Sequence, residues 1–245
     1  MLKIARINFK KCVLSLPRPY LLPARPTPFT LDFICILIIR IINVSIDEPK
    51  WQIWKKHMGT EKFYKTLAQI AVMLKNGKVL GLPTESVYGL SCIIQKAAVE
   101  KVIALKQRDL KKGFIVLSGD ISHLLALIDT EKLNEKQLEI LSQRQDKPTT
   151  WVVPVKHEYR WLTGDFGTIA VRLTDHPLLK ELTITLGCAI ISTSANLSNQ
   201  PPATSYDKVQ HYFGDQLDYI HPQQNFIAAK PSRVINLISN EVLRD

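Results

Sequence analysis

The sequence predicts a single α/β domain built around a mixed β-sheet. From Met58 onward, segments with helical periodicity alternate with short apolar runs of strand length, which is the pattern of helices packed on a sheet. Residues 58–245 are numerous enough to enclose one hydrophobic core, and neither an internal repeat nor a low-complexity linker divides them. We expect a mixed sheet rather than a purely parallel one.

Residues 1–57 differ from the rest of the chain in charge and composition. They hold 10 Lys and Arg against 3 Asp and Glu, a net charge of +7, whereas residues 58–245 hold 22 against 19, a net charge of +3. Five prolines lie between Pro17 and Pro28, which argues against a helix or a central strand there. The high pI therefore belongs mostly to this segment and does not indicate a nucleic-acid surface on the domain.

Two interpretations of residues 1–57 are open. The apolar run 33–44 and the positive charge suit a membrane-surface or targeting segment, although the run is too short to cross a bilayer and contains Arg40. Alternatively, these residues are not part of the working protein. We favour the second interpretation, because a well-formed domain start follows Met58 at once, and Met58 is a candidate translation start. No stable membrane association is expected.

The four cysteines do not indicate a metal site. They show neither C-x-x-C spacing nor a Cys/His ligand pattern, and they are Cys12, Cys35, Cys92 and Cys188. Reduced thiols in a cytoplasmic protein are the expected state.

The domain is expected to open with a helix and then a strand. Apolar side chains recur at helical spacing before a glycine in the position of a C-terminal cap: Phe63, Leu67, Ile70, Ala71, Leu74 and Gly77. The run 79–82 then predicts a buried strand, which Pro83 stops because proline has no N–H to donate. The polar residues 84–86 therefore follow a strand end. Gly81 and Gly89 bracket them, which indicates a close backbone approach or a positive φ.

The remaining elements follow from periodicity and capping signals. In chain order we expect a helix over 98–106, a strand over 114–117, a helix from a capping box at Asn134 and Gln137 to about 141, a strand over 150–155, a strand over 169–173, a helix over 177–186 and a strand over 189–191.

Two polar clusters are candidates for ligand binding. Since neither G-x-x-x-x-G-K-[ST] nor G-x-G-x-x-G occurs, a nucleotide would have to be held without the common phosphate loops. Four cations lie at the end of a predicted helix: Lys106, Arg108, Lys111 and Lys112. They suit either a solvated surface or the binding of phosphate oxygens. The segment 191–196 places three hydroxyls and an amide after an apolar strand, where α/β proteins gather ligands. Helix capping by Ser192 or Ser194 is the alternative.

These pieces, in this order and spacing, resemble the YrdC/TsaC-like threonylcarbamoyl-AMP synthase family. The resemblance rests on P-T-E-S-V-Y-G-L at 83–90, K-Q-R at 106–108 and S-A-N at 194–196, and it extends to 160–164, 169–172, 175–177 and 231–232. It covers about residues 60–245 and leaves residues 1–57 outside. Each motif alone is weak, but the ordered set is specific.

The resemblance implies one domain with a twisted mixed sheet and a basic concave groove. It also implies a nucleotidyltransferase that joins L-threonine, bicarbonate or CO2, and ATP into L-threonylcarbamoyladenylate and releases pyrophosphate. This product serves the threonylcarbamoyl modification of adenosine 37 in tRNAs that read ANN codons. Threonine's amine and CO2 give a carbamate, an oxygen nucleophile that needs no Ser-His-Asp triad. Positioning and charge stabilisation at the α-phosphate then remain for the protein.

The family pattern assigns residues of this chain to the substrates. Threonine or its carbamate is assigned to Thr84, Arg172 and Ser194, catalysis to Lys106 and Arg108, and ATP to Lys106, Arg108, Thr168, Asn196 and Thr204, with Lys112 and Ser232 as weaker additions. For Arg172, a buried ion pair at a strand end is the alternative to a bidentate carboxylate clamp. Mg²⁺ is expected with ATP, and no protein ligands are assigned to it.

Some residues depart from the family pattern or have no assigned role. Glu85 suits either assistance to Mg²⁺ or a cap, and His176 suits a structural turn. The segment 145–150 lacks the glycine of the family's loop, and Arg233 stands where a threonine is frequent.

Partners beyond the substrates are a downstream enzyme that transfers the threonylcarbamoyl group to tRNA, and direct contact with tRNA itself. Two other functions compete. A non-catalytic module that binds double-stranded RNA or tRNA would show salt-dependent RNA affinity without ATP turnover, and the sequence carries none of the usual RNA-binding motifs. A carbamoyl-phosphate-using transferase domain would be expected with acylphosphatase-like and zinc-finger segments, and neither is visible.

Overall fold

The computed structural model describes residues 63–107, 113–163, 166–222 and 232–245. Contacts within the chain divide it into two units, Met1–Met58 and Gly59–Asp245, and all described residues belong to the second unit. The expectations for residues 1–57 lie outside the described residues. None of the helices among the described residues combines the length and the apolar character that a membrane crossing requires.

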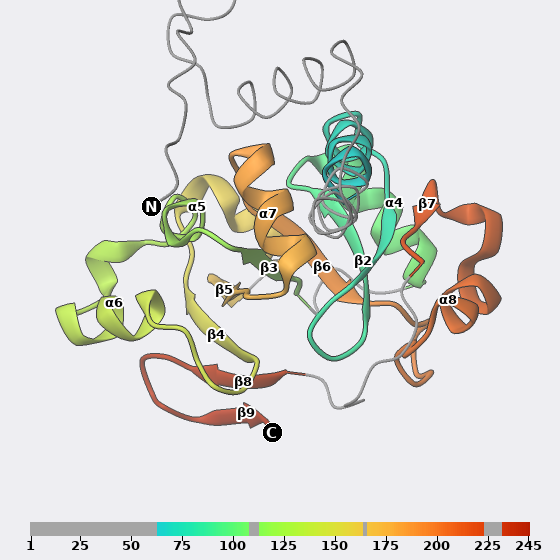
Figure 1. The fold of residues 1–245 in the computed structure, drawn as a ribbon. Coiled ribbons are helices and arrows are strands. Elements are labelled where there is room, and N and C mark those ends of the chain that lie inside the picture. Colours follow the sequence, from blue (N-terminus) through green and yellow to red (C-terminus); the bar gives the residue numbers. More distant parts are fainter. Residues whose placement is uncertain (1–62, 108–112, 164–165, 223–231) are drawn as a thin grey trace, which may run out of the picture. The chain divides into compact units, whose positions relative to one another are not determined.

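The described strands form one mixed sheet in the order β7-β1-β2-β6-β3-β5-β4-β8-β9 (Figure 1). Their bounds are β1 Leu80–Pro83, β2 Tyr88–Ile93, β3 Ile115–Ser118, β4 Thr149–Pro154, β5 Thr168–Leu173, β6 Ile190–Ser194, β7 Tyr219–Ile220, β8 Arg233–Asn236 and β9 Val242–Arg244. The pairs β1–β7, β3–β5 and β4–β8 are parallel, and the other neighbours are antiparallel. The mixed sheet predicted from the sequence is confirmed.

Helices separate most of these strands along the chain. A helix over 63–75 precedes β1, and the others are α4 Lys96–Lys106, α5 Ile121–Leu125, α6 Glu135–Ser142, α7 Pro177–Leu186 and α8 Tyr206–Phe213. Three short 3-10 helices complete the described set: η4 Thr130–Lys132, η5 His157–Leu162 and η7 Gly214–Gln216.

Local signals in the sequence explain several helix ends. Asn134 and Gln137 form the expected capping box at the start of α6, each side chain accepting from the other residue's backbone N–H. Pro177 begins α7, where the missing N–H costs nothing, and Gly187 ends it with a φ of 71°. Gly77, with a φ of 68°, follows the helix over 63–75 as predicted.

The two faces of the sheet pack differently. Ile190 belongs to a core cluster that the helix over 63–75 and α7 cover, whereas its neighbour Ile191 belongs to the larger cluster on the opposite face, with α4. Leu117 on β3 joins the first cluster. Because side chains alternate along a strand, the residues in register with Leu117 and Ile190 face the same side. Figure 1 shows α7 lying over the middle of the sheet.

The structure corrects two sequence-based boundaries. The strand expected over 189–191 runs on to Ser194, because Ser192 and Ser194 pair with Ser91 and Gly89 of β2, so the three hydroxyls lie on β6 and not in a loop after it. Pro83 is the last residue of β1 rather than the residue that stops it. The elements β2, α5, α8, β7, β8 and β9 were not predicted.

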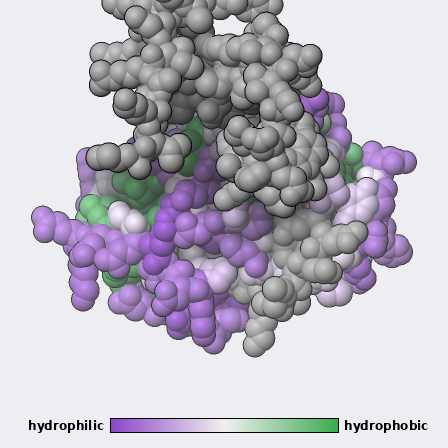
Figure 2. Space-filling view, in the orientation of Figure 1, coloured by the Kyte–Doolittle hydropathy of each residue, from purple (hydrophilic) through white to green (hydrophobic). Residues whose placement is uncertain are grey.

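Where described residues are visible in Figure 2, their surface is mostly hydrophilic, with smaller apolar patches. The large apolar side chains that are exposed among the described residues come from separate parts of the fold: Val72, Phe166, Ile184, Ile238, Val242 and Leu243. Phe166 and Leu243 line a cavity.

Gly119→Ala should destabilise the contact between β3 and α7. A Cβ at Gly119 would lie 2.7 Å from Cα of Lys180, a main-chain atom that moves only if α7 moves. Gly119 has no positive φ, so alanine adds no backbone strain that would obscure the effect. We expect a loss of about 1–3 kcal/mol in the free energy of unfolding, measured by denaturant titration. An unchanged midpoint would show that α7 moves away from β3 without cost.

Candidate active site

A cavity of about 550 Å³ lies on the same sheet face as the cluster around Leu117. Arg172 of β5 pairs with Leu117 of β3, so its side chain points to that face, at the border between apolar core and cavity. The polar side chains that line the cavity come from strands far apart in the sequence: Thr84, Ser86, Thr163, Thr168, Arg172, Ser192, Thr193, Ser194, Ser232, Asn236 and Arg244. The arrangement is a hydroxyl-rich site with two guanidinium groups.

The turn between β1 and β2 closes one side of the cavity. Thr84 donates its hydroxyl to the carbonyl of Val87 at 2.7 Å and its backbone N–H to the same oxygen at 3.1 Å. Gly89 comes next on β2, and a Cβ there would lie 2.3 Å from Oγ of Ser192. The absence of a side chain at Gly89 thus leaves room for the hydroxyl of Ser192, a close approach of the kind that the sequence indicated.

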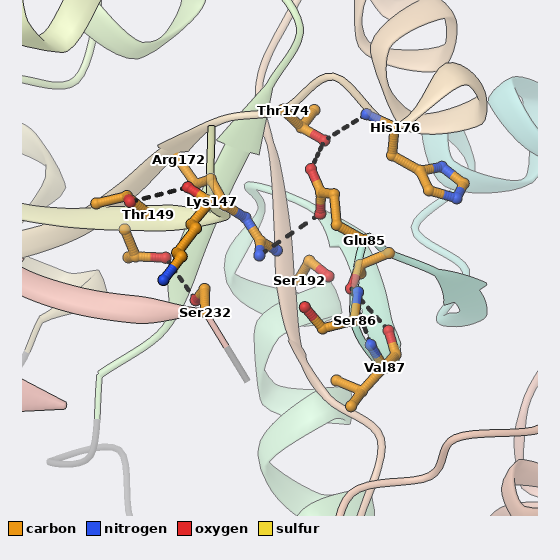
Figure 3. Close-up of polar contacts among 12 residues, drawn as sticks. Glu85, Ser86, Val87, Lys147, Thr149, Arg172, Thr174, His176, Ser192 and Ser232 are labelled. Carbon is orange, nitrogen blue, oxygen red and sulfur yellow. Dashed lines mark hydrogen bonds and ion pairs between the residues drawn. The ribbon is translucent and has the colours of Figure 1, made fainter. Parts of the chain in front are cut away.

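Arg172 lies at the centre of a buried polar network. The residue is 5% exposed, and its NH1 atom lies 3.5 Å from Oε2 of Glu85. The hydroxyl of Thr174 donates to Oε1 of Glu85, and Figure 3 shows this carboxylate between Thr174 and Arg172. The buried ion pair that the sequence offered as the alternative is present, and Arg172 also lines the cavity.

The charge state of Glu85 follows from its neighbours. Burial disfavours its ionised form, but the Arg172 guanidinium and the Thr174 hydroxyl outweigh burial and hold the pKa of Glu85 below its usual value of 4.5. Glu85 is therefore a carboxylate at neutral pH. It does not act as a helix cap.

Arg244 is a second cation of the cavity that sequence reasoning missed. Its Nε and NH2 donate to the carbonyl of Ser232 at 3.0 and 2.8 Å, and the hydroxyl of Ser232 lies 2.9 Å from that of Thr150. Burial, followed by the charge of Arg172, lowers the pKa of Arg244. Nothing in the local sequence marks this arginine, because its role depends on β9 pairing with β8 beside the cavity.

Lys106 lies behind the cavity rather than in its lining. It is 3% exposed, and its ammonium donates to the carbonyl of Ser194, to the carbonyl of Asn196 at 2.9 Å and to Oδ1 of Asn196 at 3.1 Å. The same Oδ1 accepts from the hydroxyl of Ser194 at 2.7 Å. Lys106 therefore ties the K-x-R element to the S-x-N element and fixes the end of β6.

The sequence-predicted residues thus divide into three groups. Those that line the cavity are Thr84, Thr168, Arg172, Ser194 and Ser232. Lys106, Asn196 and Thr204 are described but lie outside the lining, and Thr204 is half-buried next to Ala203. Arg108 and Lys112 lie outside the described residues.

His176 and Arg233, which the sequence analysis also singled out, lie in different surroundings. His176 precedes α7 and donates its backbone N–H to the Thr174 hydroxyl at 3.2 Å, as suits the structural turn predicted for it. Burial lowers the pKa of its imidazole. Arg233 pairs at the surface with Asp245 at 3.3 Å, while its neighbours Ser232 and Val234 line the cavity. Among the described residues, no group of three or more His, Cys, Asp and Glu side chains gathers as a metal site.

Comparisons with known proteins agree on one family. The model for Sua5, YciO and YrdC proteins, described as telomere recombination, matches residues 72–245. The chain is 43% identical over 182 residues to a threonylcarbamoyl-AMP synthase of Actinobacillus succinogenes, covering 72% of this chain and 97% of that protein. It is 39% identical over 178 residues to the enzyme of the same name from Haemophilus influenzae, with 72% and 97% covered.

Solved structures show the same fold. P. abyssi Sua5 complexed with L-threonine matches with a TM-score of 0.63 and 28% identity over 70% of this chain, and the match spans only 51% of that longer protein. E. coli YciO matches with a TM-score of 0.65 and 24% identity, covering 74% of this chain and 89% of YciO. The mixed α/β architecture with a twisted sheet is thus shared with these structures.

Lys106→Met should destabilise the fold by about 2–4 kcal/mol, because it leaves buried acceptors at Ser194 and Asn196 without their donor. The matched control is Lys101→Met on the same helix, whose exposed ammonium donates to the carbonyl of Gly77 at 3.1 Å. We expect the control to stay within about 0.5 kcal/mol of the unchanged protein in denaturant titrations. Equal losses in both variants would remove the anchoring role of Lys106.

The Glu85–Arg172 pair should make stability depend on pH in a defined direction. Because the folded pKa of Glu85 lies below its unfolded value, the ionised carboxylate stabilises the fold above about pH 4.5, and this contribution is lost as pH falls through the lower folded pKa. The melting temperature of Glu85→Gln should therefore lie below that of the unchanged protein at pH 7, and the difference should shrink below pH 4.5. A difference that stays constant down to pH 3 would contradict a charged Glu85.

Proposed function

The chain belongs to the Sua5/YciO/YrdC family, and on that premise we propose that it is a threonylcarbamoyl-AMP synthase. It joins L-threonine, bicarbonate or CO2, and ATP into L-threonylcarbamoyladenylate and releases pyrophosphate. The observation that carries the proposal is the similarity, at 35–43% identity over nearly the whole length of the relatives, to enzymes of that name. The cavity agrees with it, since Arg172 and Arg244 offer two cations to a substrate set rich in carboxylate and phosphate groups.

The reaction requires little covalent catalysis by the protein, because its nucleophile is the carbamate of the substrate. The amine of threonine adds to CO2 and loses a proton, which gives a carbamate. A carbamate oxygen then attacks the α-phosphorus of ATP, and the bond to the bridging oxygen breaks as pyrophosphate leaves. The protein's tasks are to align the two substrates and to stabilise charge on the phosphate oxygens, which fixed cationic donors in a partly dry cavity do well.

We assign Arg172 to the carboxylate of threonine, because a buried guanidinium can pair with a carboxylate through two parallel hydrogen bonds. Thr84 and Ser194 would complete the threonine side with their hydroxyls. Arg244, Thr168 and Ser232 would face ATP from the neighbouring strands.

The remaining assignments are also proposals. Arg108 and Lys112 would serve the phosphates as charged donors, and Asn196 and Thr204 would bound the nucleotide. Lys106 would act through the residues that it anchors at 194–196 rather than by touching ATP. Mg²⁺ would arrive with ATP as part of the substrate.

We also propose that residues 58–245 form the catalytic unit and that the reaction takes place in the cytoplasm. The product is a mixed anhydride and is therefore reactive, so an enzyme that transfers the threonylcarbamoyl group to tRNA must take it up. Contact of this chain with tRNA would be a consequence of that transfer.

Pyrophosphate release by the purified chain should require all three substrates. We expect release with ATP, L-threonine and bicarbonate together, and less than about a tenth of that rate when any one is omitted, since the nucleophile forms only from threonine and CO2. Mass spectrometry of the mixture should show threonylcarbamoyladenylate in the complete reaction alone. Release that continues undiminished without threonine would refute the proposed function.

A further inference from the structure

The guanidinium of Arg172 has one buried donor that the described residues do not satisfy. Its Nε is buried and has no hydrogen-bond partner, and neither has Oε2 of Glu85, which faces NH1 at 3.5 Å. Buried donors are rarely left without an acceptor, and Arg172 also lines the main cavity, so a ligand there can approach its guanidinium. Its contact with Glu85 is an ion pair that is too long for a good hydrogen bond. Glu85 therefore attracts the guanidinium without occupying the donors that a ligand needs.

Thr174 holds Glu85 in place. Its hydroxyl accepts from the backbone N–H of His176 at 3.2 Å, so its own proton is directed to Oε1 of Glu85. Arg172 and Thr174 stand two residues apart where β5 ends, and the carboxylate bridges their side chains (Figure 3). One oxygen of Glu85 is thus held by Thr174, and the other faces Arg172.

Thr174 is itself fixed by backbone hydrogen bonds. Its N–H donates to the carbonyl of Ser118 at 2.9 Å, and its carbonyl accepts from NH1 of Arg144 at 2.9 Å. NH2 of Arg144 donates to the carbonyl of Gly119 at 3.0 Å. These bonds join the end of β3, the end of β5 and the segment after α6. The position of the Glu85 carboxylate is therefore set by the sheet and not by its own turn alone.

Glu85 contacts Arg172 but does not line the main cavity. It is absent from the described lining of the 550 Å³ cavity, and it lines a separate cavity of about 280 Å³ together with residues of the segment 143–149. Arg172 lines both. A substrate in the main cavity would therefore meet Arg172 but not Glu85.

The second guanidinium of the cavity, that of Arg244, explains why a carboxylate beside Arg172 is useful. Arg244 lies close enough for its charge to interact with that of Arg172, and two like charges that face one cavity repel each other. A long arginine side chain under that repulsion would be displaced or disordered until an anion arrived. A carboxylate beside Arg172 opposes the repulsion before any anion is bound.

We propose that Glu85, fixed by Thr174, is a positioning residue that holds the Arg172 guanidinium in the orientation that receives the carboxylate of the amino-acid substrate. This inference rests on the proposed function, which supplies the amino acid. Pre-ordering the guanidinium lowers the conformational entropy that substrate binding would otherwise lose. It acts on the amino acid and not on ATP, so its effect separates the two substrates.

Steady-state kinetics of Glu85→Gln in the full chain test the proposal. The glutamine keeps the size of the side chain and its bond to Thr174 but removes the charge that faces Arg172. We expect the KM for L-threonine to rise about tenfold, with the KM for ATP and kcat within about threefold of the unchanged protein. Calorimetric titration with L-threonine should show the same weakening without turnover. Thr174→Val should reproduce the effect and Thr174→Ser should restore it, which keeps the test valid if Glu85→Gln folds poorly.

A double-mutant cycle separates positioning from a general structural role. In an Arg172→Ala background, Glu85→Gln should weaken threonine binding by no more than about twofold further, because its effect is transmitted through Arg172. The matched control is Asp218→Asn, which removes a carboxylate paired with Lys78 at 2.8 Å, remote from the cavity lining. Its KM for threonine should equal that of the unchanged protein.

The outcomes distinguish this inference from the proposed function. If the unchanged protein releases pyrophosphate without threonine, the proposed function fails, and the role of Glu85 fails with it. If the unchanged protein needs threonine but Glu85→Gln binds it equally well or more tightly, only the positioning role is overturned. Full additivity of Glu85→Gln with Arg172→Ala would likewise overturn it. A threonine-specific loss that disappears without Arg172 establishes it.

Discussion

Strand β6 is hydrogen-bonded to β2 on one side and to β3 on the other, and this double pairing fixes where each of its side chains points. Ile190 faces the helices, and two residues further on Ser192 reaches the same sheet face where the helices no longer cover it. Ile191 faces the opposite core. One short strand thus carries both the apolar support of α7 and the hydroxyls of the cavity. The register of β6 could not shift by one residue without placing isoleucine in the cavity and serine in the core.

Three cations in or behind the cavity wall differ in how their charge is used. Lys106 gives its ammonium to protein acceptors and so becomes a structural tie. Arg244 gives part of its guanidinium to Ser232 and leaves the remainder facing the cavity. Arg172 is balanced by the charge of Glu85, and its buried Nε has no hydrogen-bond partner among the described residues. Residue type alone does not distinguish these roles, because each depends on which acceptors the fold brings within reach.

The sequence predicted the parts of this fold that depend on neighbours in the chain. The capping box at Asn134 and the helix after Pro177 are local signals, and both appear where they were expected. The extension of β6 to Ser194 was missed, because polar residues on a strand that borders a cavity resemble a loop in sequence. The role of Arg244 was missed as well, since it depends on pairing between β8 and β9. The pairing of Glu85 with Arg172 could not be predicted either, because it depends on the fold bringing the β1–β2 turn next to the end of β5.

Strand β9 lies at the edge of the sheet and forms part of the cavity wall, so its stability affects how the cavity opens. Strand β9 has three residues, all exposed, and in the described sheet it pairs only with β8. Detaching such a strand breaks few hydrogen bonds and disturbs no buried cluster, so it requires much less free energy than unfolding the domain. Fraying would carry Arg244 away while Arg172 stays in the sheet, and the cavity would lose one wall and one positive charge in the same motion. A bound anion that bridges both arginines would resist this motion and slow amide hydrogen exchange in β9, whereas the departure of the anion would release it.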